Sequence, residues 1–545
     1  MPGHVNVAEL PVSFHAMKAN MLAFLNRKPL LCILVLALLL RLSAVWNSTG
    51  YLMHDDHFLV VETGASWAVG EDYNQWLPHA QRAAGIENPI PHQANLAYPG
   101  IVYVVFTVFH AIGIEDPASQ MVWLRLLHAL YSLLIVYFGY RIVHRLSDRR
   151  AAIWSGLALA CLALLPNLSV RQLVEVICIP PLMWSTWIIV RTDVDRRTVA
   201  TWLGAGVGLG LATTLRYQCG VFGVGMAAAI LWEAPSDKRW RALLPIGLLG
   251  VSSLFIFSIG QAQDLFIWER PFAQLQAYFG YNTTHSGEYP QGTWHQYIWT
   301  ILGLLIPPFS LAWVFGYFRV TKRHAMLVLP ALAFFIFHSF FPNKQERFIL
   351  PAVPFVIMAG TLGWIAFRDA SSFWKRNRRL EKGLLIGSLV VNGVLAIGFT
   401  FVEGKKARVE AMLALHEQQD LENFLAVHVD SHAMPPQFYA GSWERYWTSD
   451  ENTDIANHRQ VMCRSTTRVF PNYILFFGDV HLGEAVEQYQ DVYPSMRYLK
   501  QAAPGKWDRL LAWLNPVNSV ERVLIYEIDS ASECTEIESI HEHRM

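Results

Sequence analysis

The chain has 545 residues, of which 53% are hydrophobic and only 16% charged, and its formal net charge is zero. This balance excludes an ordinary soluble domain, and the charge gives no reason to expect a nucleic-acid partner. Apolar runs of membrane-spanning length recur along most of the chain, so the sequence predicts a polytopic α-helical membrane protein surrounded by membrane lipids.

Basic clusters predict the orientation of these runs. Residues 1–29 are expected in the cytoplasm, because Arg27 and Lys28 precede the first apolar run and no signal-peptide cleavage site follows. Most later runs begin or end at further Lys and Arg clusters, which the positive-inside rule places on the same side; about 11 to 13 transmembrane helices are predicted within 30–402. The expected spans are 30–46, 121–143, 151–165, 175–190, 202–215, 221–231, 243–260, 297–317, 326–341, 349–367 and 384–401, with 101–112 either a crossing or a re-entrant segment.

The expected topology places three polar loops on the outer face, at 47–95, 261–295 and 338–348. The first loop holds two short amphipathic stretches, 56–69 and 73–83, which predict helices lying on the membrane face. All three loops share the outer face with the part of the chain that follows the last span.

The long apolar runs cease after residue 402, and 403–545 is long enough to bury a core of its own. Compact apolar stretches at 472–477 and 523–528 predict strands, and 409–427 predicts a helix, so we expect a small external α/β domain. Its two cysteines, Cys463 and Cys534, have no motif spacing, and whether they pair stays open. No glycine pattern of a nucleotide-binding site occurs in the chain.

The first external loop carries Asp55 and Asp56 between His54 and His57. A carboxylate at the membrane surface can act as general base on a hydroxyl while its neighbour orients the acceptor or tunes its pKa. Two alternatives stay open. The acids can simply be solvated, or the four residues can bind a divalent metal, although adjacent side chains on a regular element point apart.

Two further motifs lie in the other external loops. Loop 261–295 contains Asp264, Phe266 and Trp268, followed by Tyr281 and Asn282. Around loop 338–348, the chain reads His338, Ser339, then Asn343, Lys344, Gln345, Glu346, Arg347 and Phe348.

With the acidic pair before Phe58, these motifs resemble glycosyltransferase family 22, the membrane mannosyltransferases that extend lipid-linked N-glycan precursors and glycosylphosphatidylinositol anchors. That family has an acidic pair before an aromatic residue, then an Asp, aromatic and Trp element leading to a Tyr-Asn pair. Its third signature is His-Ser followed by His-Lys-Glu-Glu-Arg-Phe. The resemblance covers about 30–401, with the motifs in the family's order and on the expected face.

The resemblance implies a GT-C fold and an enzyme that takes a sugar, most often mannose, from a polyprenyl-phosphate donor to a lipid-linked glycan or other glycolipid acceptor. For this transfer we expect an inverting single displacement in which Asp55 is the base and Asp56 orients the acceptor or shares that role. No cofactor is implied. Three cations are expected to hold the donor phosphate, namely Lys344, Arg347 and Arg216. Seven residues are expected to bind substrate, namely His54, Asp264, Trp268, Tyr281, Asn282, His338 and Glu346.

Two departures from the family pattern keep other functions open. Asn343 and Gln345 replace the family's usual His and Glu, which puts the sugar and the acceptor in doubt and permits an inactive assembly subunit. A transporter or flippase for a lipid-linked substrate is a further alternative, although such proteins usually carry ionisable residues near the membrane midplane. The outer face would be the endoplasmic reticulum lumen or the bacterial periplasm.

Overall fold

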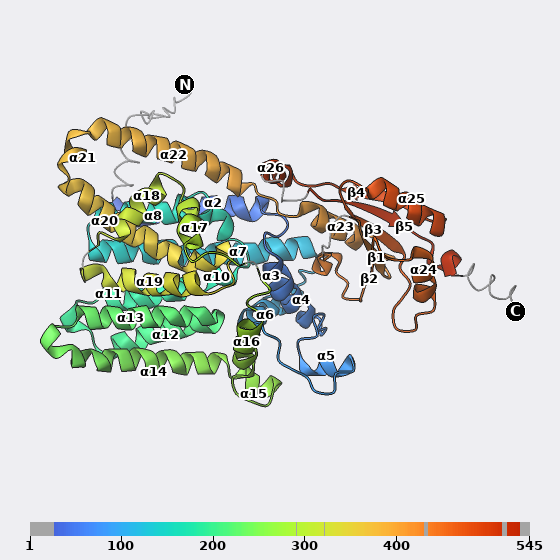
Figure 1. Ribbon diagram of the computed structural model, residues 1–545, viewed down its shortest axis with the longest axis horizontal. Coiled ribbons are helices and arrows are strands. Elements are labelled where there is room, and N and C mark those ends of the chain that lie inside the picture. Colours follow the sequence, from blue (N-terminus) through green and yellow to red (C-terminus); the bar gives the residue numbers. More distant parts are fainter. Residues whose placement is uncertain (1–26, 290, 321, 430–433, 515–519, 535–545) are drawn as a thin grey trace, which may run out of the picture.

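The structure is a computed structural model that describes residues 27–289, 291–320, 322–429, 434–514 and 520–534. A helical bundle and a smaller domain with a sheet follow one another along the long axis (Figure 1). The prediction of a mostly helical chain with a small C-terminal α/β domain is therefore confirmed.

The helices of the bundle and its loops are α2 (Pro29–Asn47), α3 (His54–Asp56), α4 (Thr63–Ala68), α5 (Pro78–Ala83), α6 (Ala97–Ala111), α7 (Pro117–Leu146), α8 (Arg149–Cys161), α9 (Leu165–Leu168), α10 (Val174–Ile177), α11 (Ile179–Val190), α12 (Val199–Leu215), α13 (Gly220–Glu233), α14 (Leu243–Gly260), α15 (Gln263–Ile267), α16 (Ala273–Thr284), α17 (Gln296–Leu304), α18 (Phe309–Tyr317), α19 (Ala325–Phe340), α20 (Val353–Ala370), α21 (Ser372–Arg376) and α22 (Arg378–Thr400). Short segments of other helix types join them: the π-helical η1 (His57–Glu62) and the 3-10 segments η2 (Val194–Arg196), η3 (Tyr217–Cys219), η4 (Ser236–Ala242), η5 (Lys322–His324) and η6 (Glu346–Ala352).

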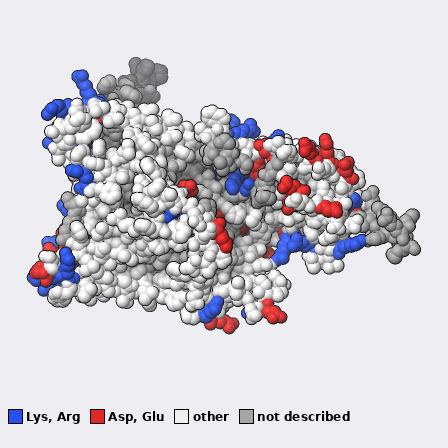
Figure 2. All heavy atoms as spheres, viewed as in Figure 1, with Lys and Arg blue, Asp and Glu red and all other residues white. Residues whose placement is uncertain are grey.

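Within the described residues, 5 helical stretches are long and apolar enough to cross a membrane. They are Pro29–Asn47, Pro117–Leu146, Ser236–Ile267, Glu346–Ala370 and Arg378–Thr400, and four shorter apolar helices accompany them, at Ala97–Ala111, Val174–Val190, Val199–Leu215 and Ala325–Phe340. In Figure 2, charged side chains lie at the left end of the bundle and over the sheet domain, and the surface between is largely uncharged. This distribution is that of a protein embedded in a bilayer.

Local sequence explains where several helices begin. Asp116 accepts a hydrogen bond from the backbone N–H of Ser119 and caps α7, whose first residue is Pro117. Asp148 caps α8 in the same way. Both caps accept from backbone N–H groups that have no partner inside the helix. Proline is tolerated at the first position of α7 because the N–H that it lacks would have no partner there.

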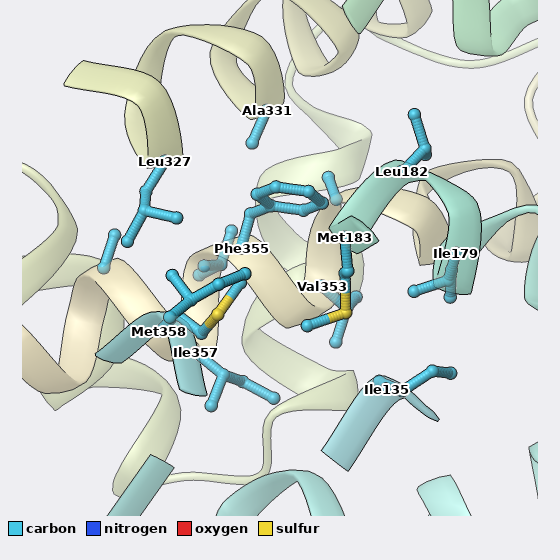
Figure 3. Close-up of a cluster of buried hydrophobic side chains, with 14 of the residues drawn as sticks. Ile135, Ile179, Leu182, Met183, Leu327, Ala331, Val353, Phe355, Ile357 and Met358 are labelled. Carbon is cyan, nitrogen blue, oxygen red and sulfur yellow. The ribbon is translucent and has the colours of Figure 1, made fainter. Parts of the chain in front are cut away.

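The interior of the bundle is packed with aliphatic, methionine and aromatic side chains. Figure 3 shows part of it, where Met183 of α11 lies beside Val353 and Phe355 of α20. Burial of such side chains contributes about 1.5–3 kcal/mol each relative to water, although lipid would cover those on the outer surface equally well.

Two predicted spans are interrupted. The expected span 297–317 consists of α17 and α18, which are separated at Pro307 and Pro308, because proline lacks the N–H that an uninterrupted helix needs. The expected span 175–190 consists of α10 and α11, with Cys178 between them. The expected span 297–317 is therefore divided into two shorter helices, whereas 175–190 matches the apolar helical stretch Val174–Val190.

The C-terminal domain has a five-stranded mixed sheet in the order β2-β1-β3-β5-β4. Strand β1 pairs in parallel with β2 and β3, whereas β5 pairs antiparallel with β3 and β4. A disulfide joins Cys463 and Cys534, which answers the question that the spacing left open. The elements of the domain are α23 (Lys406–His416), β1 (Phe424–His428), η7 (Gln437–Ala440), β2 (Trp447–Asp450), α24 (Ile455–Cys463), β3 (Tyr473–Gly478), α25 (Leu482–Val492), β4 (Arg497–Ala502), α26 (Lys506–Leu514) and β5 (Arg522–Glu527).

The strands expected at 472–477 and 523–528 are confirmed as β3 and β5. The helix expected over 409–427 is wrong in its second half, because α23 ends at His416 and Phe424–His428 is strand β1. Four of the five side chains in β1 are buried. A short, continuously apolar run reads the same in a buried strand as in a buried helix, which explains the error.

The first external loop lies between the bundle and the sheet domain. Residues 54–68 form one nearly continuous helix through α3, η1 and α4, and the expected helix 73–83 is shortened to α5. Phe58 and Val61 are buried in a cluster that includes Phe106 of α6 and Phe438 of the sheet domain. The prediction that 56–69 lies on the membrane face is wrong, because its apolar side is covered by protein.

Two contacts fasten this loop to the sheet domain, and a third fastens it to the bundle. The ring of His57 stacks between Tyr51 and Tyr439, at centroid distances of 4.8 Å and 5.3 Å. Glu62 accepts a hydrogen bond of 3.2 Å from the backbone N–H of Phe438. The buried Arg171 of the bundle donates to the carbonyl oxygens of Gly50 and Val402. We call this set of contacts the domain clamp.

Candidate active site

The acidic pair occupies the short helix α3, at the end of the bundle that faces the sheet domain. The Asp55 side chain is 44% exposed and that of Asp56 only 7%, because adjacent residues of a helix point in different directions. Burial raises the pKa of Asp56 well above its ordinary value, and Arg347 opposes that rise. One carboxylate is therefore open to a substrate, and the other is held inside.

Arg347 links both carboxylates to the third external loop. Its guanidinium donates to Asp55 and, over 3.3 Å, to Asp56. Its Nε donates to Gln345 over 2.9 Å, so the Gln at a departure from the family pattern supports the arginine. Because Arg347 lies on η6 and the aspartates on α3, this contact joins loops 47–95 and 338–348.

Loop 261–295 reaches the same place. Gln291 forms an isolated antiparallel bridge with Asn343, and the hydroxyl of Tyr278 on α16 accepts from the side chain of Gln218, beside Arg216. The described residues of the three polar loops therefore meet at one end of the bundle.

Glu175 is a residue of this site that the sequence analysis missed. It is 2% exposed, and its Oε1 lies 3.5 Å from Nη1 of Arg216 and 3.9 Å from Nε of Arg347. A buried carboxylate between two guanidiniums offsets part of their mutual repulsion. Its signal in the sequence was a single acidic residue at the start of an otherwise apolar run, which is a functional hypothesis in a membrane protein.

Arg216 lies between aromatic rings, 5.9 Å from Phe334 and 5.4 Å from Phe348. Its Nε is 3.4 Å from the side-chain oxygen of Gln218, and its buried Nη1 has no hydrogen-bond partner among the described residues. Nearby, Oδ2 of Asp56 and Oε2 of Glu175 are buried without partners in the same part of the chain. The site thus holds donors and acceptors in reserve for a polar ligand.

Lys344 has a different position from the other two cations. Its ammonium group donates to the carbonyl oxygens of His338 and Ser339, over 2.6 Å and 2.8 Å, and to that of Phe341. These are carbonyls at the end of α19, so all three N–H donors of Lys344 are used as a helix C-cap. The geometry brings Arg347 and Arg216 to the carboxylates but not Lys344.

We expect Lys344→Met to lower the free energy of unfolding by about 2 kcal/mol, because three charge-assisted hydrogen bonds at a helix end are lost. The donor KM should change less than about threefold, since the ammonium is not free to bind phosphate. Thermal unfolding of purified protein and donor titrations measure the two effects, with the exposed Lys238→Met as matched control. An unchanged unfolding midpoint with a tenfold higher KM would assign Lys344 to the phosphate instead.

Two of the remaining residues predicted to bind substrate, His338 and Glu346, lie near the arginines. His338 is buried with Nδ1 2.9 Å from the carbonyl oxygen of Phe334, and its Nε2 has no partner among the described residues. Glu346 is exposed beside Arg347. Both lie close to Arg216 or Arg347, where a substrate could contact them.

Most side chains of the motif in loop 261–295 bond to other residues of the same loop. Asp264 is buried, and its Oδ2 accepts from the backbone N–H of Gln274 over 3.1 Å at the start of α16. Asn282 donates to the carbonyl of Tyr278 one turn earlier, and Tyr281 contacts Tyr289. The buried Nε1 of Trp268 has no partner among the described residues.

The two histidines beside the acidic pair do not converge on it. His54 is exposed and stacks on Phe58 at 4.4 Å, and burial of part of its ring lowers its pKa below the ordinary value. His57 turns to Glu62, at 3.3 Å, because η1 is π-helical and brings residues five apart onto one side. The described residues contain no group of three or more His, Cys, Asp or Glu arranged to hold a metal ion.

Comparison with known proteins identifies the family. Residues 94–440, more than half of the chain, match the Alg9-like mannosyltransferase family. The chain belongs to this family. Among curated proteins, it is similar to GPI mannosyltransferase 3 of Saccharomyces cerevisiae, with 24% identity over 295 residues, 52% of this chain and 44% of the relative. The aligned part therefore spans less than half of the relative's length.

Solved structures show the fold of this Alg9-like protein. It is similar to ArnT from Cupriavidus metallidurans, which was crystallised with undecaprenyl phosphate, at a TM-score of 0.55 and 14% identity over 91% of this chain and 97% of that one. It is also similar to the oligosaccharyltransferase AglB from Archaeoglobus fulgidus, solved with an inhibitory peptide and a dolichol-phosphate, at a TM-score of 0.50 and 12% identity over 89% and 75%. The predicted GT-C fold is thereby confirmed, and the protein is a multi-pass integral membrane protein.

Proposed function

We propose that this protein transfers mannose from a polyprenyl-phosphate donor to a lipid-linked glycan or glycolipid. The transfer would take place on the luminal or periplasmic face of the endoplasmic reticulum or bacterial inner membrane. The observation that carries the proposal is the cluster of Asp55, Asp56, Glu175, Arg216 and Arg347, at the end of an apolar bundle where an external domain begins. Such a donor needs an apolar surface for its lipid tail and charged groups for its phosphate, and this end of the bundle offers both.

The reaction is an inverting single displacement. The acceptor hydroxyl oxygen bonds to the anomeric carbon while the bond from that carbon to the phosphate oxygen breaks, and the polyprenyl phosphate leaves with the electron pair. Asp55 takes the hydroxyl proton, because its carboxylate is the one open to substrate. A base in this position contributes about 10²–10⁴-fold.

The arginines have separate roles in this proposal. Arg347 holds both aspartates, and its own donors are already engaged. Arg216 stabilises the departing phosphate, because its buried Nη1 faces Glu175 at 3.5 Å as an ion pair but has no hydrogen-bond partner among the described residues. Fixed cations at the point where charge develops are usually the largest contribution to catalysis of this type. The assignment of Lys344 to the phosphate is not kept in this proposal, since the ammonium caps α19.

The relative from Saccharomyces cerevisiae is named for glycosylphosphatidylinositol mannosylation, which supports a glycolipid acceptor of that class. Lipid-linked N-glycan precursors are the second acceptor class, because the matching family is described as Alg9-like. The polyprenyl and dolichol phosphates in the two structural relatives support a donor of the same chemistry.

The test is mannose transfer by the purified full-length protein from polyprenyl-phosphate mannose to both acceptor classes, with GDP-mannose as alternative donor. We expect transfer from the lipid donor only. In parallel, Arg216→Gln should raise the donor KM at least about tenfold, and Arg216→Lys less, because a lysine keeps the charge without the planar fork. Transfer from GDP-mannose, or none by folded protein with any donor, would contradict the proposal and favour a transporter or an inactive subunit.

A further inference from the structure

A cavity of 550 Å³ lies between α22 and the rest of the bundle, away from the acidic site. Its walls come from five helices, with Trp154 and Leu157 on α8, Trp313 on α18, Trp364 on α20, Trp374 on α21 and Leu385 on α22. Most of the lining is apolar, so water gains few partners inside it. None of the acidic-site residues lines this cavity.

The topology predicted from the basic clusters places this cavity in the cytoplasmic half of the bundle. Along α22 it reaches from Glu381 to Asn392, which are 11 residues apart, and therefore extends about 16 Å at the helical rise of 1.5 Å per residue. That is roughly half of a hydrocarbon core about 30 Å thick, the depth of one leaflet. The inner end is closed where Asn392 bonds to the backbone of Cys161 and Ala163.

The wall formed by α22 is a single peripheral helix. Only 17% of the spanning part of this helix is buried, and it runs along the outside of the bundle (Figure 1). Across the cytoplasmic end, Arg368 of α20 donates to Glu381 of α22 over 2.9 Å and to Asp369. Its charge is therefore balanced by carboxylates within the protein.

Exposed cations surround this end. They are Lys375, Arg376, Arg378, Arg379 and Lys382, in α21 and the first turns of α22. Of these, Arg378 has a carboxylate nearby, Glu381 at 3.6 Å, and for the other four no ion pair is seen in the described chain. Figure 2 shows basic side chains at the corner where Figure 1 places α21.

We propose that this cavity binds an anionic glycerophospholipid of the cytoplasmic leaflet. Its acyl chain enters between α22 and the bundle, and its phosphate headgroup lies on the cations of α21 and α22. Basic residues beside a gap between membrane helices recognise such headgroups, and each exposed cation contributes about fivefold to binding. The depth of one leaflet fits an acyl chain that starts at the cytoplasmic surface. The polyprenyl donor must instead reach Asp55 at the opposite end.

Native mass spectrometry of the full-length protein, titrated with equal amounts of phosphatidylglycerol and phosphatidylcholine, tests this site. We expect phosphatidylglycerol to be retained at least about tenfold more strongly. The charge variant Arg376→Gln/Arg379→Gln and the filling variants Ala158→Trp and Ala312→Phe should each lower that retention at least about tenfold. The matched control Lys238→Gln/Arg239→Gln, at the exposed turn between α13 and α14, should retain the lipid as the parent does.

Equal retention of the two lipids would overturn the proposal. Unchanged retention in both filling variants would overturn it as well, because the lipid would then bind at the surface alone. If the protein forms a dimer that covers α22 and excludes phosphatidylglycerol, the occupant of the cavity is a second copy of the chain and the proposal is overturned. Two filling variants on different helices guard against misfolding of one. The measurement involves no sugar transfer, so it is independent of the proposed function.

Discussion

Asp55→Asn is expected to reduce kcat for mannose transfer by at least about a hundredfold, because an amide of the same shape cannot accept the acceptor's proton. The pair with Arg347 is lost with the charge, but the site is open to water there, so the protein should remain folded. The decrease should appear in kcat and in kcat/KM alike, since the base acts in the transition state. Initial rates over a range of acceptor concentrations measure it.

Glu71→Gln is the matched control for this prediction. It removes an exposed carboxylate from the same external loop, outside the acidic cluster, and should leave the rate within about twofold. Asp56→Asn separates the two aspartates. If it abolishes transfer while Asp55→Asn keeps most of the parent's rate, the buried carboxyl is the base and our assignment is reversed.

Arg347→Gln is expected to destabilise the protein by about 3–5 kcal/mol and to abolish transfer, because the buried Asp56 and Glu175 then lose a cation. The decrease in the free energy of unfolding should depend on pH. The folded-state pKa of Asp56 is raised, so this carboxyl favours folding at low pH and loses that contribution as pH rises towards the folded-state pKa. Removing the arginine raises that pKa further, and the destabilisation should be larger at about pH 8 than at about pH 5.

Thermal unfolding at both pH values tests this prediction. Arg497→Gln is the control, since Arg497 pairs with Glu527 on the surface at 3.1 Å and should cost less than about 1 kcal/mol. The double variant Asp56→Asn/Arg347→Gln should recover part of the lost stability, because no buried aspartate charge is left without its cation. An equal loss at both pH values would show that Arg347 acts through packing rather than through its charge.

The sequence predicted the membrane bundle, the small C-terminal α/β domain and the meeting of three polar loops, because these depend on long apolar runs and on the side to which basic clusters belong. Motif order then identified the family and placed Asp55, Asp56 and Arg347 together. Only three-dimensional packing could assign Lys344 to a helix end and Arg216 to an aromatic pocket. Glu175 carried a readable signal, but its position at the edge of an apolar run concealed it. His57 looked equivalent to His54 until the π-helical turn directed it to Glu62.

The domain clamp bears on when the enzyme becomes competent during its synthesis. Every side chain of the acidic cluster has been translated once α20 begins, yet Tyr439 and Phe438, which fix the helix that carries Asp55, emerge about ninety residues later. Until then, the ring of His57 can stack on Tyr51 but not on Tyr439, and Glu62 lacks the N–H donor of Phe438. A nascent chain would thus hold a complete set of catalytic groups that are not yet held in register. Assembly of the site is in this way deferred to the last stage of folding, when the bundle is already in the bilayer.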